Sequence, residues 1–247
     1  MSYCFIIPCY NHSTTLHSTI SGLLPYQLPV IVVDDGSAPE HAARIRQVCD
    51  DFAPQQVTLL RKNINGGKGE AVISAIQLAQ QQGHSHALQV DADGQHNLDD
   101  IPAMLRRSQQ QPEALISGRP LYDESVPKAR LYGRYATHVW VWIETLSFSL
   151  ADSMCGFRVY PVAAFTELVN KVRIGRRMDF DTEIMVRLYW RGVPVEFIPT
   201  RVIYPENGTS NFKVWRDNLM ISWMHTKLFF GMLLRLPVLL RRKLQSR

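Results

Sequence analysis

The chain has few cysteines and no long uncharged apolar run. Its 247 residues include four cysteines, with no Cys-x-x-Cys pair and no regular spacing. This usage predicts a reducing, intracellular compartment and no zinc site. No uncharged apolar run reaches the roughly 18–20 residues that a membrane-spanning helix needs. The N-terminus lacks a basic segment and a cleavage-site pattern, so we expect no secretory signal.

The basic residues are concentrated at the C-terminus. The formal charge is +5, and from Lys213 onward eight basic residues stand against one acid, Asp217. This tail carries +7, which leaves about −2 for residues 1–212. The basicity therefore predicts a C-terminal appendage and not a nucleic-acid-binding face. The boundary is placed between a catalytic domain, 1–212, and a helical segment, 213–247.

Strand-like and helix-like segments alternate through the first half. The predicted strands are Tyr3–Ile7 (stopped by Pro8), Val30–Val33, Val57–Leu60, His86–Val90 and Ala114–Ser117. Helices are predicted near residues 13–24, 39–52, 68–82 and 98–110. Continuous apolar strands joined by helices predict an α/β fold with a mostly parallel central sheet flanked by helices.

The predicted strands end in unusual polar segments. These are Pro8–Asn11, Asp34–Ser37, Asn63–Gly69 and Asp91–Asp93. Parallel sheets present ligand sites at the carboxyl ends of their strands, so we expect these segments to form one site. Asp91 and Asp93 can turn both carboxylates toward one point, where oxygen ligands suit Mg²⁺ or Mn²⁺.

The glycine-rich segment Asn65–Glu70 leaves two interpretations open. It lacks the Ser or Thr after Lys68 that a P-loop uses, and Val72 stands where a dinucleotide motif needs its third glycine. It is either a turn into the next helix or a backbone-and-lysine contact to a nucleotide at a helix N-terminus.

The second half is less regular. Thr137–Leu150 is apolar nearly all round and predicts a buried helix, with contact to a lipid substrate as the alternative. Met178 to about Arg191 predicts a helix whose first acids are either caps or catalytic groups. Val193–Ile198 and Arg201–Tyr204 predict two short strands.

The segment Val214–Leu240 is rich in Trp, Met, Leu and Phe, but charges and Pro237 interrupt it. With Arg241–Lys243 at its end, it is typical of interfacial helices lying on an anionic cytoplasmic leaflet. A dimer interface and a helical hairpin packed on the core are the alternatives.

Taken in order, the motifs resemble those of the family 2 inverting glycosyltransferases, which have the GT-A fold. The similarity is greatest to dolichol- or polyprenyl-phosphate sugar synthases, and it covers about residues 3–212. The motifs are Pro8–Asn11, Val33–Ser37, Gly67–Gly69, Asp91–His96, Ser117–Arg119, Cys155–Arg158 and Asn207–Ser210. Two departures concern acceptor-phosphate recognition: Cys155 replaces the usual Ser, and Asn211 and Phe212 replace a Lys or Arg.

The resemblance implies a role for each matched position. The nucleotide-sugar would contact Pro8, Tyr10, Asn11, Asp34, Asp35, Lys68 and Asp91. The Asp34–Asp35 pair would contact base and ribose, in an order left open. A Mg²⁺ or Mn²⁺ ion would bind Asp91, Asp93 and Gln95. Donor or acceptor phosphates would contact Arg119, Arg158 and the loop around Ser210.

The chemistry of the residues predicts the same reaction. A cation held by Asp91 and Asp93 stabilises a diphosphate leaving group as a Lewis acid. A lipid-phosphate acceptor needs no base, whereas a hydroxyl acceptor needs a carboxylate. Asp181 is the candidate base, and Asp179 and Glu183 are second choices. On one helix Asp179 and Glu183 would share a face and Asp181 would point elsewhere, so we do not expect them to act together.

We therefore expect a metal-dependent glycosyltransferase that moves a sugar from a UDP- or GDP-sugar to a polyprenyl phosphate or lipid hydroxyl. It would be peripheral to the cytoplasmic face of the plasma membrane, with Asp93 and Asp181 central to catalysis. The alternatives are a nucleotidyltransferase and a non-catalytic membrane-bound scaffold of the same fold. The sugar, the nucleotide and the oligomeric state stay open. Gln95 disfavours an aspartyl phosphatase, whose signature has Thr or Val there.

Overall fold

The computed structural model describes residues 1–53, 56–121, 128–201 and 214–245. Its strands are β1 (Tyr3–Cys9), β2 (Val30–Asp34), β3 (Val57–Arg61), β4 (His86–Gln89), β5 (Leu115–Leu121), β6 (Arg158–Pro161) and β7 (Val195–Arg201). Its helices are α1 (Ser13–Leu23), α2 (Pro39–Asp50), α3 (Lys68–Gln81), α4 (Ile101–Gln110), α5 (Lys128–Thr145), α6 (Val162–Lys171), α7 (Phe180–Trp190) and α8 (Val214–Gln245). Two short 3-10 turns, Leu24–Tyr26 and Leu98–Asp100, precede β2 and α4.

The strands form one seven-stranded sheet in the order β3-β2-β1-β4-β6-β5-β7. β1 to β4 pair in parallel, as do β5 and β7, and β6 runs antiparallel to both of its neighbours. This arrangement confirms the prediction of an α/β fold with a mostly parallel sheet. It also brings the carboxyl ends of β3, β2, β1 and β4 to one edge, where the polar segments begin.

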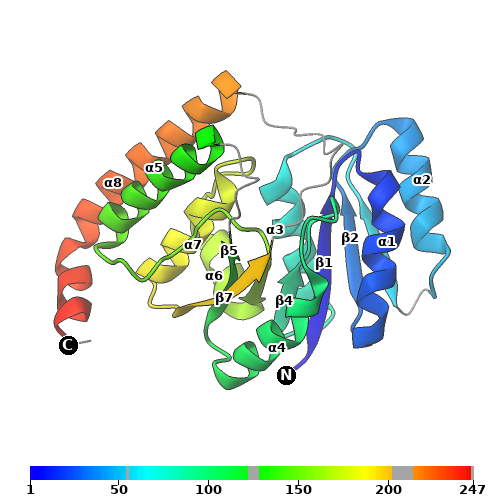
Figure 1. Cartoon of the computed structure of the whole chain (residues 1–247), viewed down its shortest axis with the longest axis horizontal. Helices are drawn as coiled ribbons and strands as arrows, with labels where there is room; N and C mark the ends of the chain where they lie inside the picture. Colours follow the sequence, from blue (N-terminus) through cyan, green and yellow to red (C-terminus); the bar gives the residue numbers. More distant parts are fainter. Residues whose placement is uncertain (54–55, 122–127, 202–213, 246–247) are drawn as a thin grey trace.

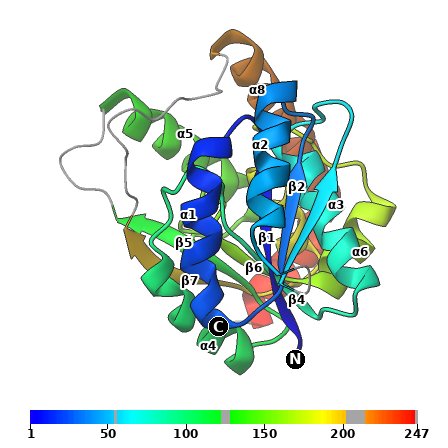
Figure 2. The same cartoon turned by 90° about the vertical axis from the view of Figure 1, so that its right-hand side faces the viewer.

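Helices cover both faces of the sheet. α1, α2 and α4 pack on one face, where Leu16, Ile45 and Met104 join a buried cluster with Phe5 and Ile7 of β1. Figure 2 looks onto α1 and α2 in front of the sheet. α3 and α5 to α8 cover the other face, in a second cluster that takes in alternate residues of the same strands. The alternation of a strand's side chains explains why the apolar runs are continuous.

Three predictions about element boundaries are wrong. β1 does not stop at Pro8, because its pairing with β2 continues and the carbonyl of Cys9 accepts from the Asp35 N–H at 2.9 Å. β7 continues to Arg201 without the predicted break after Ile198, and residues 202–204 of the second predicted strand lie outside the described residues. Helix α5 begins earlier than expected and ends at Thr145, before Leu150.

The prediction that the Thr137–Leu150 segment is a buried helix is wrong for one of its faces. Val141 and Glu144 are fully buried, whereas Val139, Trp140 and Ile143 are 49%, 44% and 39% exposed. The nearly uniform apolar composition hides this division, because the exposed positions are as apolar as the buried ones. Figure 1 shows α5 beside α8, at the side of the molecule away from α1 and α2.

The C-terminal segment is one helix, α8, which continues through Pro237. Figure 1 shows a bend near the red end of this helix, as a proline inside a helix produces. Met224, Leu228, Met232 and Leu239 of α8 belong to the core cluster of this face. Within the described ranges, no helix is both long and apolar enough to cross a membrane. The boundary at 212/213 stays a prediction, because residues 202–213 lie outside the described ranges.

Candidate active site

The polar segments at the ends of β1 and β2 are joined by hydrogen bonds. Asn11 has a positive φ of 57°, which turns its backbone N–H toward Ser37 Oγ at 2.9 Å. Its side-chain Oδ1 accepts from the Ala38 N–H at 3.0 Å. Pro8 is buried within β1 and Tyr10 is half-buried just beyond it. The first loop is therefore fixed against the second before any ligand is considered.

The Asp34 and Asp35 carboxylates both fix loops. Asp34 Oδ1 accepts from the Ser37 N–H at 2.9 Å, and Oδ2 pairs with Arg61 at 3.0 Å. Asp35 accepts from the N–H groups of Gly66 at 3.0 Å and Gly67 at 2.7 Å. Burial raises the pKa of Asp35, and these two N–H donors oppose that rise. The structure leaves the base and ribose contacts of this pair as predictions.

The glycine-rich segment reaches the Asp91 loop through Lys68, the first residue of α3. Lys68 Nζ lies 2.8 Å from Asp91 Oδ2 and 3.2 Å from Asp181 Oδ2. Burial alone would lower the pKa of Lys68, but the two carboxylates raise it above its ordinary value. Burial likewise opposes ionisation of Asp91, yet Lys68 and His96 hold its pKa well below the usual range. One ammonium thus joins two predicted site residues from different elements.

Behind this ion pair is a buried polar chain that the sequence did not indicate. Gln89 Nε2 donates to Asp91 Oδ1 at 2.9 Å, and Tyr160 donates to Gln89 Oε1 at 3.3 Å. Gln89 and Tyr160 are fully buried on the paired strands β4 and β6. Both oxygens of Asp91 are therefore in hydrogen bonds. A glutamine inside an otherwise apolar strand was the one available signal.

Asp93 and Gln95 follow Asp91 in a short turn. The Gln95 N–H donates to Asp93 Oδ1 at 3.0 Å, and both side chains are half-buried. His96 stacks on Phe157, and its Nδ1 accepts from the Asp91 N–H at 3.3 Å. Burial lowers the pKa of His96 despite the carboxylates of Asp91 and Asp93, which matches the acceptor role of its ring nitrogen.

The donor chemistry of this turn fits a hard divalent cation. Carboxylates of Asp91 and Asp93 and the amide oxygen of Gln95 are the oxygen ligands that Mg²⁺ and Mn²⁺ take. In the described part of the chain, no group of three or more His, Cys, Asp or Glu residues could hold a metal. Two carboxylates and one amide are fewer ligands than Mg²⁺ takes, so a cation held here would complete its shell with phosphate oxygens and water.

The loop before β6 closes over the Lys68 ion pair. A Cβ at Gly156 would lie 2.5 Å from Lys68 Nζ, 2.8 Å from Gln89 Nε2 and 2.9 Å from Asp91 Oδ2. Only glycine allows this approach of the backbone. Asp152 fixes this loop, because its Oδ1 accepts from the backbone N–H groups of Met154 and Cys155, at 2.8 Å each.

Arg158 lies beneath this loop and is fully buried. Its two terminal nitrogens donate to the backbone carbonyls of Asp181 and Ser153, at 2.7 Å each. The guanidinium thus joins the start of α7 to the loop before β6. Its predicted contact with a phosphate stays a prediction.

A cluster that the sequence did not indicate surrounds Asp152. Arg134 and His138, one turn apart on α5, lie 2.6 Å and 3.8 Å from Asp152 Oδ2. Arg119, exposed on β5, is close enough to lower the pKa of His138. The positions are far apart in sequence, so only the fold brings them together. We call Arg119, Arg134, His138 and Asp152 the α5 basic cluster.

The three acids near the start of α7 have different surroundings. Asp181 faces Lys68, as described above. Glu183 is fully buried and pairs with Arg187 at 2.7 Å and with Lys227 of α8 at 3.5 Å. Asp179 accepts from the Arg177 N–H at 3.1 Å. Asp179 and Glu183 therefore have other partners than the Lys68 ammonium, and the catalytic role of any of the three stays a prediction. Ser210 lies outside the described residues.

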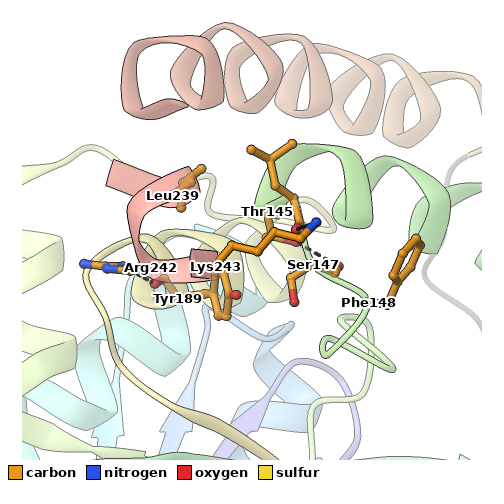
Figure 3. Close-up of a pocket in the computed structure, with 8 residues that line it drawn as sticks. Thr145, Ser147, Phe148, Tyr189, Leu239, Arg242 and Lys243 are labelled. Carbon is orange, nitrogen blue, oxygen red and sulfur yellow. Dashed lines mark hydrogen bonds between the residues drawn. The ribbon is translucent and has the colours of Figure 1, made fainter. Parts of the chain in front are cut away.

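A pocket of about 350 Å³ lies at the C-terminal end of α8 and shares no lining residue with the candidate active site (Figure 3). It is lined by Thr145, Leu146, Ser147, Phe148, Tyr189, Leu239, Arg242 and Lys243. Arg242 donates to the carbonyls of Tyr189 and Trp190 at 3.2 and 2.9 Å, and Lys243 to that of Leu146 at 3.3 Å. These two cations thus satisfy carbonyls at the C-terminal ends of α7 and α5.

The chain is similar in sequence to two glycosyltransferases. The chain is 22% identical over 244 residues to UDP-N-acetylglucosamine–dolichyl-phosphate N-acetylglucosaminyltransferase of Methanococcus voltae, covering 93% of this chain and 94% of the relative. It is 24% identical over 211 residues to dolichyl-phosphate beta-glucosyltransferase of Dictyostelium discoideum, covering 77% of this chain and 63% of the relative.

The chain is also similar to a solved structure and matches a family model. Glucosyl-3-phosphoglycerate synthase of Mycobacterium tuberculosis, in complex with Mn²⁺, uridine diphosphate and phosphoglyceric acid, has a TM-score of 0.67 at 13% identity, covering 95% of this chain and 78% of that chain. At this identity the likeness shows the fold, and it confirms the GT-A prediction. Residues 4–166, more than half of the chain, match the model described as glycosyl transferase family 2. The chain is therefore a glycosyltransferase that belongs to family 2.

Proposed function

We propose that the protein transfers a sugar from a UDP- or GDP-sugar to a lipid-linked acceptor, with Mg²⁺ or Mn²⁺, at a membrane surface. The observation that carries this proposal is the Lys68 ion pair, which places Asp91 of the Asp-x-Asp turn and Asp181 of α7 around one ammonium. A cation-binding carboxylate and a candidate base thus lie on two sides of one point. A sugar transferase needs such an arrangement to act on both the leaving group and the acceptor.

The donor side rests on the joined strand ends. Asn11, Asp34, Asp35 and Lys68 belong to three loops that hydrogen bonds connect into one edge of the sheet. Ligands of open α/β sheets bind outside such an edge. When bound, a divalent cation at Asp91 and Asp93 neutralises the charge that develops on the departing diphosphate.

Asp181 is suited to receive a proton. Its Oδ2 is held by Lys68, and its Oδ1 is buried without a hydrogen-bond partner among the described residues. A buried acceptor oxygen normally has a partner, so the group that Oδ1 meets is expected to come from a substrate. With a hydroxyl acceptor, Oδ1 would take the proton as the oxygen attacks. With a phosphate acceptor, Asp181 would orient Lys68 and no base is needed.

The α5 basic cluster supports an anionic acceptor. Arg119, Arg134 and His138 supply three groups that can donate to a phosphate, against one acid, Asp152. Asp152 also fixes the loop that reaches Lys68, so one short segment connects the cluster to the ion pair. Two of the relatives carry dolichyl phosphate in their names, which agrees with a lipid phosphate as the acceptor here.

The outer side of α5 and α8 supports contact with a membrane. Its exposed apolar residues are Tyr132, Tyr135, Val139, Trp140 and Ile143 of α5, with Trp215, Leu219, Trp223, Phe230, Leu234 and Val238 of α8. We call this set the α5–α8 apolar face. Its members recur at helical spacing, opposite the buried residues Met224, Leu228 and Met232. Arg216 and Arg241 are exposed on the same helix, as expected for an anionic leaflet.

The competing functions predict different products. From such a donor a nucleotidyltransferase would transfer the nucleoside monophosphate and release a sugar 1-phosphate, and a scaffold would release nothing. The test is a panel of UDP- and GDP-sugars with Mn²⁺ and the full chain, with and without polyprenyl phosphate. We expect UDP or GDP to be released from at least one donor and release to rise with the lipid. Nucleotide transfer without sugar transfer would contradict the proposal.

A further inference from the structure

The Lys68 ammonium holds a position that a cation at Asp91 would also need. Its Nζ is 2.8 Å from Asp91 Oδ2, while Gln89 occupies Asp91 Oδ1 at 2.9 Å. Both carboxylate oxygens of Asp91 therefore already accept a hydrogen bond. A divalent cation that binds Asp91 through Oδ2 must share that oxygen with Lys68 or displace it.

The surroundings restrict where Lys68 can go. Lys68 cannot move toward the loop before β6, because even a Cβ added at Gly156 would lie only 2.5 Å from Lys68 Nζ. The remaining partner is Asp181, at 3.2 Å from the same nitrogen. The side chains of Lys68, Asp91 and Asp181 are only 26%, 20% and 13% exposed, so the surrounding water screens their charges weakly.

We infer that Lys68 is a positioning residue that competes with the divalent cation for Asp91 Oδ2 and moves toward Asp181 when the cation binds. Like charges repel at this distance, so the two cannot both be held at full strength by one carboxylate. Loading of the donor-side cation would thereby strengthen the Lys68–Asp181 pair and set the Asp181 carboxylate on the acceptor side. This inference rests on the proposed function only in taking a divalent cation to bind at Asp91.

Lys62 supplies a matched control. Its side chain is 25% exposed, against 26% for Lys68, and it also pairs with a half-buried acid, Glu70. It donates in addition to Ser74 at 3.0 Å. Its partners lie on α3 and outside the Asp91–Asp181 pair. Removing its charge therefore tests the effect of any buried lysine near this edge of the sheet.

The experiment measures Mn²⁺ binding to the full chain directly, by the electron paramagnetic resonance signal of free Mn²⁺, in wild type, Lys68→Met, Lys68→Gln, Lys68→Arg and Lys62→Met. We expect both uncharged Lys68 variants to bind Mn²⁺ at least about tenfold more tightly, because the repulsion between an ammonium and a divalent cation about 4 Å apart exceeds that factor in affinity even at the dielectric constant of water. Lys68→Arg keeps the charge and should bind within about threefold of wild type, as should Lys62→Met. Circular dichroism checks the fold of each variant.

Unchanged or weaker Mn²⁺ binding in Lys68→Met and Lys68→Gln would overturn the inference, because a merely structural lysine would loosen the site. Absence of Mn²⁺ binding to wild type would overturn it too. The proposed function would fail differently, by the absence of sugar transfer from every donor. Tighter Mn²⁺ binding in the uncharged variants would support the competition even then, because that readout needs no turnover.

Discussion

His225 Nδ1 lies 2.8 Å from Glu144 Oε1, and both side chains are buried between α8 and α5. The Glu144 carbonyl also accepts from the Trp190 indole at 2.9 Å, which adds α7 to the contact. Burial raises the pKa of Glu144 and the His225 hydrogen bond opposes the rise. The C-terminal helix is thus connected to the helix that carries Asp181, so its truncation would test the fold as well as any membrane contact.

Breaking this pair should destabilise the protein. In His225→Ala, Glu144 would remain buried without its partner, and we expect the free energy of unfolding to fall by about 3 kcal/mol. The measurement is urea unfolding followed by circular dichroism. Thr226→Ala, on the exposed side of α8, should change it by less than about 0.5 kcal/mol. Equal stability of His225→Ala and wild type would contradict the role of the pair.

Gly156→Ala should reduce sugar transfer far more than it reduces stability. The added methyl group would displace Lys68, Gln89 or Asp91, and a shift of about 1 Å in such a site can cost about 100-fold in rate. Gly133→Ala is the control. A Cβ at Gly133 of α5 meets nothing within 4 Å, so this change should stabilise the helix by about 0.5–1 kcal/mol and leave transfer unchanged. Full activity of Gly156→Ala would show that the loop tolerates the displacement.

The protein should lose stability as the pH falls from 7 to 5, partly because of His138. Burial lowers the pKa of His138; Asp152 opposes this, and Arg134 and Arg119 add to it. A histidine with a lowered pKa binds fewer protons when folded than when unfolded, so stability is lost as the pH falls through the unfolded value of about 6.5. His138→Gln should therefore show a shallower loss in thermal unfolding between pH 7 and 5. His17→Gln replaces an exposed histidine and is the control, which should lose stability as steeply as wild type. An equally steep loss in His138→Gln would rule out this contribution.

The α5–α8 apolar face should bind anionic membranes. Trp223 and Leu234 are 64% and 83% exposed on α8, so their replacement by Gln disturbs no buried contact. We expect the double variant to bind vesicles of phosphatidylglycerol and phosphatidylethanolamine at least about tenfold more weakly in a flotation assay, because two large apolar side chains are lost from the interface. Ile64→Gln is the matched control, since Ile64 is 81% exposed but lies far along the chain in the loop before α3. Equal binding by all three proteins would argue against a membrane role for this face.

The first half of the fold could be predicted because β1, β2 and β4 are buried on both faces and read as continuous apolar runs. The polar segments that follow these strands then had to meet at one edge, and they do, through Asn11, Asp35 and Lys68. The position of the Asp91 turn at this edge of the sheet was therefore predictable from its place in the chain.

Other parts depend on contacts that sequence spacing does not encode. The approach of Arg134 and His138 to Asp152 requires α5 to cross the loop before β6, and nothing local specifies that crossing. The pairing of Lys68 with Asp181 joins residues more than a hundred positions apart. The exposed face of α5 was missed because exposed and core-facing positions share one apolar composition, so periodicity cannot separate them.

The most direct test of the account is sugar transfer by Asp93→Asn. Asn at this position can still accept the Gln95 N–H through Oδ1, so the turn should keep its fold while losing the charge that we propose binds the cation. Asp99→Asn, an exposed exchange six residues on, is the control. The measurement is the transfer of labelled sugar from the active donor to polyprenyl phosphate with Mn²⁺, read in the organic phase. We predict full transfer by wild type and Asp99→Asn and a loss of at least about 100-fold in Asp93→Asn. Undiminished transfer by a folded Asp93→Asn would contradict the account.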